Sequence, residues 1–147
     1  MIDLDRDVRF RIYRHFARTG RAPSTEDLTA ALTIGPKDVE ESLGRLASDR
    51  SIVLAPGTHN IWMAHPFSAV PTPYPVRTAT GTYWANCAWD ALGICAILGV
   101  DGESETRCAE SGEPLTIRVA EGRASPDGVV VHFLVPPKRF WENVGFT

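Results

Sequence analysis

The chain has 147 residues, with 15 Lys or Arg against 18 Asp or Glu, 12 Gly, 11 Pro and 3 Cys. This length suits one domain or two small modules, and no apolar run reaches the roughly 18–20 residues of a membrane span. A net charge of −3 argues against a dedicated nucleic-acid or membrane-surface binder. Residues 1–10 carry three Asp and two Arg, unlike a signal peptide, and three unevenly spaced cysteines make no disulfide scaffold. We therefore expect reduced thiols in a cytoplasmic protein.

Residues 1–63 are charge-rich and show helical periodicity. A first helix is predicted by Val8, Ile12 and Phe16, which recur at i, i+4 and i+8. A capping-box pattern at residues 24–27 begins a second helix, and Pro36 stands at the tolerated first position of a third. Two short strands then flank the turn at residues 55–58. Three helices followed by a hairpin predict a winged-helix-like module.

Winged helices often bind DNA through their third helix. Here residues 36–50 hold three basic side chains but four acidic ones. That balance does not attract a polyanion, so we expect a structural role for the module and no nucleic-acid partner.

Residues 64–75 are rich in proline and predict an extended connector. In residues 76–147, short strands are expected at 76–78, 82–84, 105–108, 115–119 and 129–134, with one apolar helix between the second and the third. The predicted class is α+β: an N-terminal three-helix winged-helix-like module, then a small, mostly antiparallel sheet with one buried helix.

Cys87 is the leading candidate for chemistry. If Asn86 caps the apolar helix, Cys87 lies in its first turn, where the helix dipole and free N–H groups favour thiolate. Asp90 follows three residues later on the same face. A thiolate could then take a soft electrophile while the carboxyl group carries a proton. The alternative is a buried cysteine beside an aspartate that helps to cap the helix.

Other candidates are weaker on the residues alone. Cys95 lies about 12 Å from Cys87 along the helix axis and has the apolar neighbours of a core residue. Cys108 follows a predicted strand and is expected to be structural, although the fold could bring it near Cys87. His132 lies in an apolar predicted strand and could in principle act as a base for Cys87. No C-x-x-C or H-x-x-x-H pair indicates zinc.

Four segments, taken in order, resemble the organomercurial lyase (alkylmercury lyase) family. They are residues 66–73 (PFSAVPTP), 83–93 (YWANCAWDALG), 107–115 (RCAESGEPL) and 131–141 (VHFLVPPKRFW). The first is similar to the segment leading into the catalytic domain, and the second to the active-site helix with its Cys-x-x-Asp. The N-terminal module also suits the family, so the resemblance covers nearly the whole chain.

The resemblance implies cleavage of carbon–mercury bonds by protonolysis, in mercury detoxification. Cys87 would take the organomercurial as a thiolate and hold the metal, and Asp90 would protonate the leaving carbon and help to hold the mercury. Cys108 matches a family cysteine regarded as structural. The resemblance implies no cofactor besides external thiols, a small organomercurial as the partner, and a mercuric reductase as a possible acceptor of the metal. Mercury is soft and prefers thiolate, which agrees with these roles.

The family also uses a second catalytic cysteine, placed after the segment that residues 131–147 resemble. This sequence ends with Phe146 and Thr147 at about that point, so we expect the C-terminal segment with that cysteine to be missing. An external thiol, a partner chain or Cys108 could replace it. Two other hypotheses stay open: a truncated or degenerate relative that binds mercury or another thiophilic metal without turnover, and a winged-helix regulator that senses such a metal through Cys87.

Overall fold

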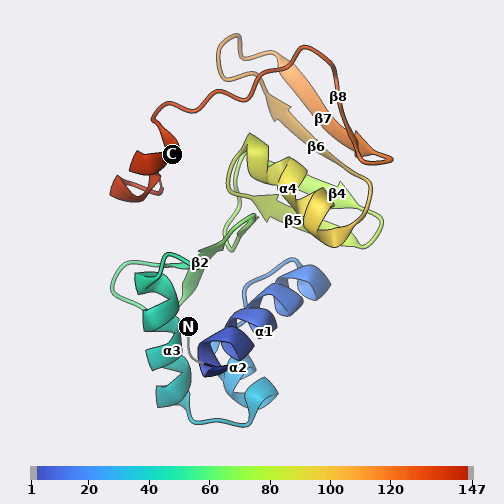
Figure 1. The fold of residues 1–147 in the computed structure, drawn as a ribbon. Coiled ribbons are helices and arrows are strands. Elements are labelled where there is room, and N and C mark those ends of the chain that lie inside the picture. The colour runs from blue at the N-terminus through green and yellow to red at the C-terminus, as the bar shows by residue number, and fades with distance from the viewer. Residues whose placement is uncertain (1–2, 146–147) are drawn as a thin grey trace.

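The computed structural model describes residues 3–145 and has an α+β fold (Figure 1). The helices are α1 (Asp3–Thr19), α2 (Thr25–Leu32), α3 (Pro36–Ser48) and α4 (Ala88–Leu98), with a 3₁₀ helix η1 (Pro137–Glu142) near the C-terminus. The strands are β1 (Val53–Leu54), β2 (Ile61–Ala64), β3 (Phe67–Ser68), β4 (Pro75–Thr78), β5 (Gly81–Ala85), β6 (Gly102–Arg107), β7 (Pro114–Ala120) and β8 (Arg123–Ser125). This architecture confirms the predicted class.

The three N-terminal helices pack around a common apolar interior. The predicted stripe of Val8, Ile12 and Phe16 is fully buried on α1. Ser24 caps α2 with the reciprocal hydrogen bonds of a capping box, as its sequence pattern predicts. Pro36 begins α3, as expected.

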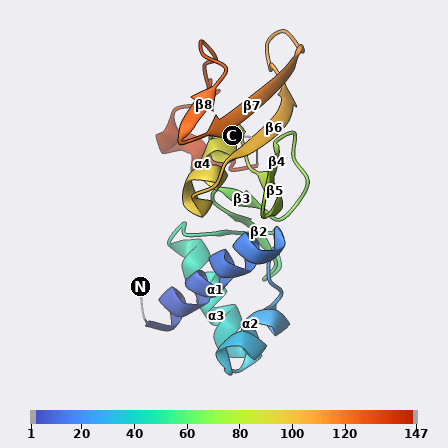
Figure 2. The same ribbon diagram turned by 90° about the vertical axis from the view of Figure 1, so that its right-hand side faces the viewer.

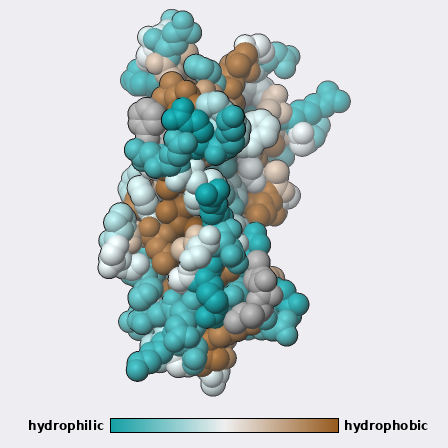
Figure 3. Space-filling model, turned by 60° about the vertical axis from the view of Figure 1, so that its left-hand side comes forward, coloured by the Kyte–Doolittle hydropathy of each residue, from teal (hydrophilic) through white to brown (hydrophobic). Residues whose placement is uncertain are grey.

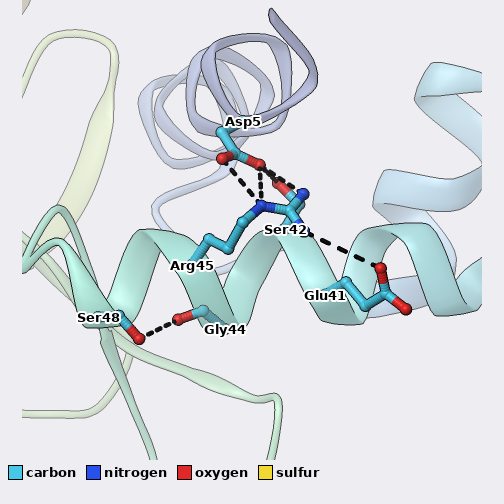
Figure 4. A network of polar contacts seen from close by, with 6 residues as sticks. All are labelled: Asp5, Glu41, Ser42, Gly44, Arg45 and Ser48. Atoms are coloured by element: carbon cyan, nitrogen blue, oxygen red, sulfur yellow. Dashed lines mark hydrogen bonds and ion pairs between the residues drawn. The ribbon is translucent and has the colours of Figure 1, made fainter. Parts of the chain in front are cut away.

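A buried ion pair fastens α1 to α3. Asp5 is only 2% exposed, and its carboxylate accepts hydrogen bonds from the Arg45 guanidinium at 2.8–3.2 Å and from the Ser42 hydroxyl at 2.7 Å (Figure 4). The hydrogen bonds from Arg45 hold the pKa of Asp5 below its usual value, against the opposing effect of burial. The contact therefore fixes the charged carboxylate between the two helices.

The eight strands within residues 3–145 join one antiparallel sheet in the order β1-β2-β3-β5-β4-β6-β7-β8. The β1–β2 hairpin follows α3, and β2 then pairs with β3, which pairs with β5. Strand β3 lies inside the segment expected to be a connector, so the sheet runs without a break from the N-terminal module to β8. Figure 2 shows the helical module stacked at one end of this sheet.

Aromatic side chains fill the junction between the helical module and the sheet. Phe16 of α1 stacks on Phe67 of β3 at 5.2 Å between ring centroids, and Tyr83 of β5 lies 5.8 Å from the same ring. The Tyr83 hydroxyl donates to the carbonyl of Ala17 at 2.9 Å. The apolar core thus continues from the charge-rich helical part of the chain into the part that consists mostly of strands.

Helix α4 lies across β4 and β5 (Figure 1). Ala91, Ile94 and Cys95 are buried, whereas Trp89 and Ile97 are more than half exposed. The helix therefore packs by one face. Space-filling shows apolar surface gathered in patches between hydrophilic areas on one side of the molecule (Figure 3).

The prediction of a strand at residues 129–134 is wrong. This segment has no regular secondary structure, and Val130 and Leu134 are 83% and 70% exposed. The apolar run has the composition of a strand, but within residues 3–145 no neighbouring strand pairs with it. No helix in that same range has both the length and the apolar character to cross a bilayer.

Candidate functional site

Cys87 occupies the N-cap of α4, one residue later than predicted. Its backbone is extended, with φ −151° and ψ −179°, and its carbonyl accepts the first helical hydrogen bond from Ala91 at 3.1 Å. Asn86 is therefore not the cap, because its side chain is engaged elsewhere. Cys87 therefore directly precedes the first turn of α4 instead of lying within it.

Asp90 lies in the first turn of α4, where the Cys-x-x-Asp spacing brings it beside the thiol. Its side chain is 15% exposed. The carboxyl group interacts with Cys87 both by charge and by a hydrogen bond. A thiol and a carboxyl group therefore lie next to one another at the start of one helix.

The helix terminus acts on the Cys87 thiol in the expected direction, but other effects outweigh it. Burial raises the pKa of the Cys87 thiol, and the negative charge of Asp90 raises it further. The backbone N–H groups of Asp90 and Trp89 act in the predicted direction and lower it, but they do not prevail. The neutral thiol is favoured beside a carboxylate that can receive its proton.

His65, which the sequence analysis did not single out for this site, reaches the same carboxyl group. Its Nδ1 lies 3.2 Å from Oδ2 of Asp90, across 25 residues of sequence. The Tyr13 hydroxyl donates to the backbone carbonyl of His65 at 2.9 Å, which ties this part of the chain to α1. One feature of the sequence could have pointed to His65: it directly precedes residues 66–73, the first of the four segments that resemble the family.

Asn86 completes the cluster around Asp90. Its Nδ2 lies 3.1 Å from Asp90 Oδ2, 3.1 Å from the carbonyl oxygen of Pro66 and 3.3 Å from His65 Nδ1. Two oxygen acceptors around one atom fix the orientation of the amide, because only the nitrogen can donate to them. Asn86 Oδ1 is buried and has no hydrogen-bond partner among the described residues.

The C-terminal 3₁₀ helix η1 packs against the histidine. The ring of Trp141 meets His65 edge-on at 6.2 Å between centroids. The guanidinium of Arg50, just beyond α3, lies over the Trp141 ring, 5.6 Å from its centre. Residues from both ends of the chain therefore surround the Asp90 cluster.

The remaining cysteines lie elsewhere. Cys95 is buried, and its Sγ faces the backbone of Gly102 at the start of β6, which agrees with a core residue. Cys108 follows β6 in the β6–β7 turn, where hydrogen bonds from Ser111 lower the pKa of its thiol. His132 is exposed, and within residues 3–145 no hydrogen bond or ion pair joins it to Cys87.

No group of three or more His, Cys, Asp or Glu side chains in the described part of the chain is arranged to hold a metal ion. A cleft of about 670 Å³ lies between the loop after α1 and the sheet, with Trp62 and Trp84 in its wall. Cys87 does not line this cleft. The candidate site is thus the Cys87–Asp90 pair together with His65 and Asn86.

Comparison with known proteins identifies the family of this chain. The family model for alkylmercury lyase, MerB, matches residues 67–147, more than half of the chain, and this range includes Cys87 and Asp90. The chain therefore belongs to the alkylmercury lyase family. His65 lies just before the matched range.

Among solved structures, the chain is similar to the crystal structure of the mercury-bound form of MerB2. The TM-score is 0.64 and the sequences are 25% identical, over 84% of this chain and 66% of the MerB2 chain. The chain thus spans slightly less than two thirds of that relative. A search of curated proteins found no match.

Proposed function

We propose that the protein is an organomercurial lyase that cleaves carbon–mercury bonds by protonolysis, with Cys87 as the capturing thiol and Asp90 as the proton donor. The observation that carries this function is the hydrogen-bonded Cys87–Asp90 pair at the mouth of α4, within the region that matches the family. The substrate class is a small alkyl- or arylmercury compound.

The neutral thiol is the form from which the reaction starts. When an R–Hg⁺ species approaches, a sulfur–mercury bond forms at Cys87 and the thiol proton passes to the neighbouring Asp90 carboxylate. The transfer is short because the thiol already hydrogen-bonds to that group. Mercury prefers soft thiolate over oxygen ligands, which favours the exchange.

Cleavage then returns the same proton. Asp90, now a neutral acid, protonates the carbon, the carbon–mercury bond breaks, and the hydrocarbon R–H leaves. The electron pair of the broken bond becomes the new C–H bond, Hg²⁺ stays on the Cys87 sulfur, and Asp90 is again a carboxylate. A positioned general acid typically contributes about 10²–10⁴-fold to such a step.

A second thiol must take over the mercury for turnover. Neither Cys95, in the core, nor Cys108, in the β6–β7 turn, contacts Cys87 through an interaction among residues 3–145. We assign this role to an external thiol, after which a mercuric reductase is the proposed acceptor. The division into a winged-helix-like module (1–63), a connector (64–75) and a catalytic part (76–147), and a cytoplasmic location, belong to the same proposal.

The test is release of benzene from phenylmercury by purified protein in excess thiol. Cys87→Ser should abolish both stoichiometric mercury capture and benzene release, because a hydroxyl is a poor ligand for mercury. Asp90→Asn should keep capture but slow benzene release by about 10²–10⁴-fold, since the amide has no proton to deliver.

Cys95→Ser serves as the matched control, because this cysteine lies in the core and the variant should release benzene at close to the wild-type rate once folded. Full benzene release by Cys87→Ser would contradict the assignment of the thiol. Equal rates for Asp90→Asn and wild type would contradict the assignment of the acid.

Capture without turnover is the second candidate function. The lack of a second thiol in contact with Cys87 among residues 3–145 favours it, because onward transfer of the metal needs another thiol. Stoichiometric mercury binding through Cys87 with no benzene release would select it over the lyase.

A further inference from the structure

We propose that His65, with Asn86, is a positioning residue that holds one oxygen of Asp90 and thereby leaves the other oxygen to take and deliver the proton. The inference rests on the proposed function for its catalytic consequence, but neither the comparisons nor the sequence analysis assigns a role to His65, and the sequence analysis considers Asn86 only as a helix cap. His65 also lies outside the range that matches the family model.

Both hydrogen bonds of the cluster end on the same atom. His65 Nδ1 lies 3.2 Å and Asn86 Nδ2 3.1 Å from Asp90 Oδ2. An oxygen that accepts two hydrogen bonds is the poorer place for a proton, since an O–H there would face two donors. The proton of the acid form therefore resides on Oδ1.

The geometry also selects the tautomer of His65. Asn86 Nδ2 must donate to the Pro66 carbonyl and to Asp90, because both partners are acceptors only. These two bonds use both of its hydrogens, so none remains for His65 Nδ1 at 3.3 Å. A neutral His65 then carries its proton on Nδ1 and donates it to Asp90.

The surroundings hold the imidazole in this place. The backbone carbonyl of His65 is bound by Tyr13, and Trp141 packs edge-on against the ring. Asp90 on α4 is in ion-pair distance of the ring, and Arg50, just beyond α3, lies over the Trp141 ring that packs against it. At 40% side-chain exposure the ring still reaches solvent, whereas Asp90 is 15% exposed.

Two substitutions of His65 distinguish a positioning role from a role in proton transfer. His65→Asn keeps a nitrogen donor on a side chain short enough to replace Nδ1, but it cannot carry a proton. His65→Leu removes the donor and keeps an apolar side chain against Trp141. We expect kcat for benzene release from phenylmercury to fall roughly 10–100-fold in His65→Leu, the size of effect that a misplaced reacting group produces, and to stay within about threefold of wild type in His65→Asn.

Stoichiometric capture of phenylmercury by Cys87 should be equal in wild type and both variants, because the thiol is unchanged. His59→Asn is the matched control, since His59 lies in the β1–β2 turn beside Glu40, away from the cluster. Equal loss in His65→Asn and His65→Leu would overturn positioning by a hydrogen bond. An unchanged kcat in His65→Leu would show that His65 does not position Asp90 for the reaction.

A second readout does not depend on turnover. The ¹⁵N signals of the His65 ring, assigned by their absence from His65→Asn, should show the Nδ1–H form when the ring is neutral. In Asp90→Ala the facing acceptor is gone and the Asn86 amide becomes free to donate to Nδ1, so the ring should change to the Nε2–H form. An unprotonated Nδ1 in wild type would overturn the inference, even if benzene release fails and the proposed function falls with it.

Discussion

The thiol of Cys87 and the carboxyl group of Asp90 lie side by side at the start of α4. Burial and the neighbouring carboxylate raise the pKa of the thiol, which favours its neutral form. A more acidic cysteine would be a better free nucleophile, but it would have lost the proton that protonolysis needs. The raised pKa is therefore consistent with a site built to exchange a proton for a metal.

Alkylation of the thiols by iodoacetamide at different pH values measures this property. The rate at Cys87 should keep rising with pH beyond the value of about 8.5 that is typical of a free thiol, because burial and Asp90 raise its pKa. Removal of the like charge in Asp90→Asn should move the rise to lower pH.

Cys108 is the internal control, because hydrogen bonds from Ser111 lower the pKa of its thiol. Its alkylation should level off at lower pH than that of Cys87, as followed by mass spectrometry of the labelled peptides. The reverse order of the two cysteines would contradict the electrostatics of the site.

Helices α1 and α3 are joined by a polar contact inside an otherwise apolar interface. Asp5 is buried with Ser42, while Arg45 remains 40% exposed at its side chain. A charge in this position is tolerated because three hydrogen bonds from Arg45 and one from Ser42 replace its water. The pair also sets how the two helices are aligned.

Asp5→Asn should lower the free energy of unfolding by about 2 kcal/mol at neutral pH, the scale of a hydrogen bond to a charged group. Because the pKa of Asp5 is lower in the folded protein, its contribution is present above the unfolded-state value of about 3.9 and is lost as pH falls through the folded-state value. Urea unfolding at several pH values should show the difference between wild type and variant shrinking in acid.

Asp7→Asn is the control for that experiment, since Asp7 is exposed on the same helix. Its unfolding free energy should lie within about 0.5 kcal/mol of wild type. A comparable loss at both positions would show that the buried pair has no special role.

At the scale of the whole molecule, the helical module and the sheet are in close contact. Gly20 ends α1 with φ +68°, and a side chain there would collide with the carbonyl oxygen of Thr82 in β5. The same junction carries the Phe16–Phe67 stack and the Tyr83 hydrogen bond to Ala17. The module is therefore part of the support on which the site is built, since Tyr13 of α1 also binds the backbone of His65.

Gly20→Ala tests this junction against Gly57→Ala. Both glycines have positive φ, but Gly57 has no described atom within 4 Å of the position of a Cβ. Gly57→Ala should cost about 1 kcal/mol for its backbone conformation, and Gly20→Ala about 1–3 kcal/mol more for the collision. Equal urea midpoints for the two variants would mean that the junction accommodates the added methyl group without loss of stability.

Local patterns were sufficient for the helices and for the Cys87–Asp90 pair. The stripe of Val8, Ile12 and Phe16 and the capping box at Ser24 depend on neighbours within a few residues, and both are confirmed. Cys87 and Asp90 are three residues apart, so any helix that begins there brings them together. Their catalytic roles remain predictions.

Long-range contacts decided the features that local patterns did not predict. The run at 129–134 has strand composition, but a strand exists only where a neighbouring strand pairs with it, and composition does not encode that neighbour. The direction of the Cys87 pKa shift could not be predicted from the sequence, because burial, its largest cause, is a property of the packed fold. His65 reaches Asp90 across 25 residues only because β2, β3 and β5 lie side by side and bring residues 65 and 86 together. The sequence by itself determined the helices, the class and the proximity of Cys87 to Asp90, because these depend on local spacing. Only the tertiary structure decided what surrounds these two residues, because burial and hydrogen-bond partners come from distant parts of the chain.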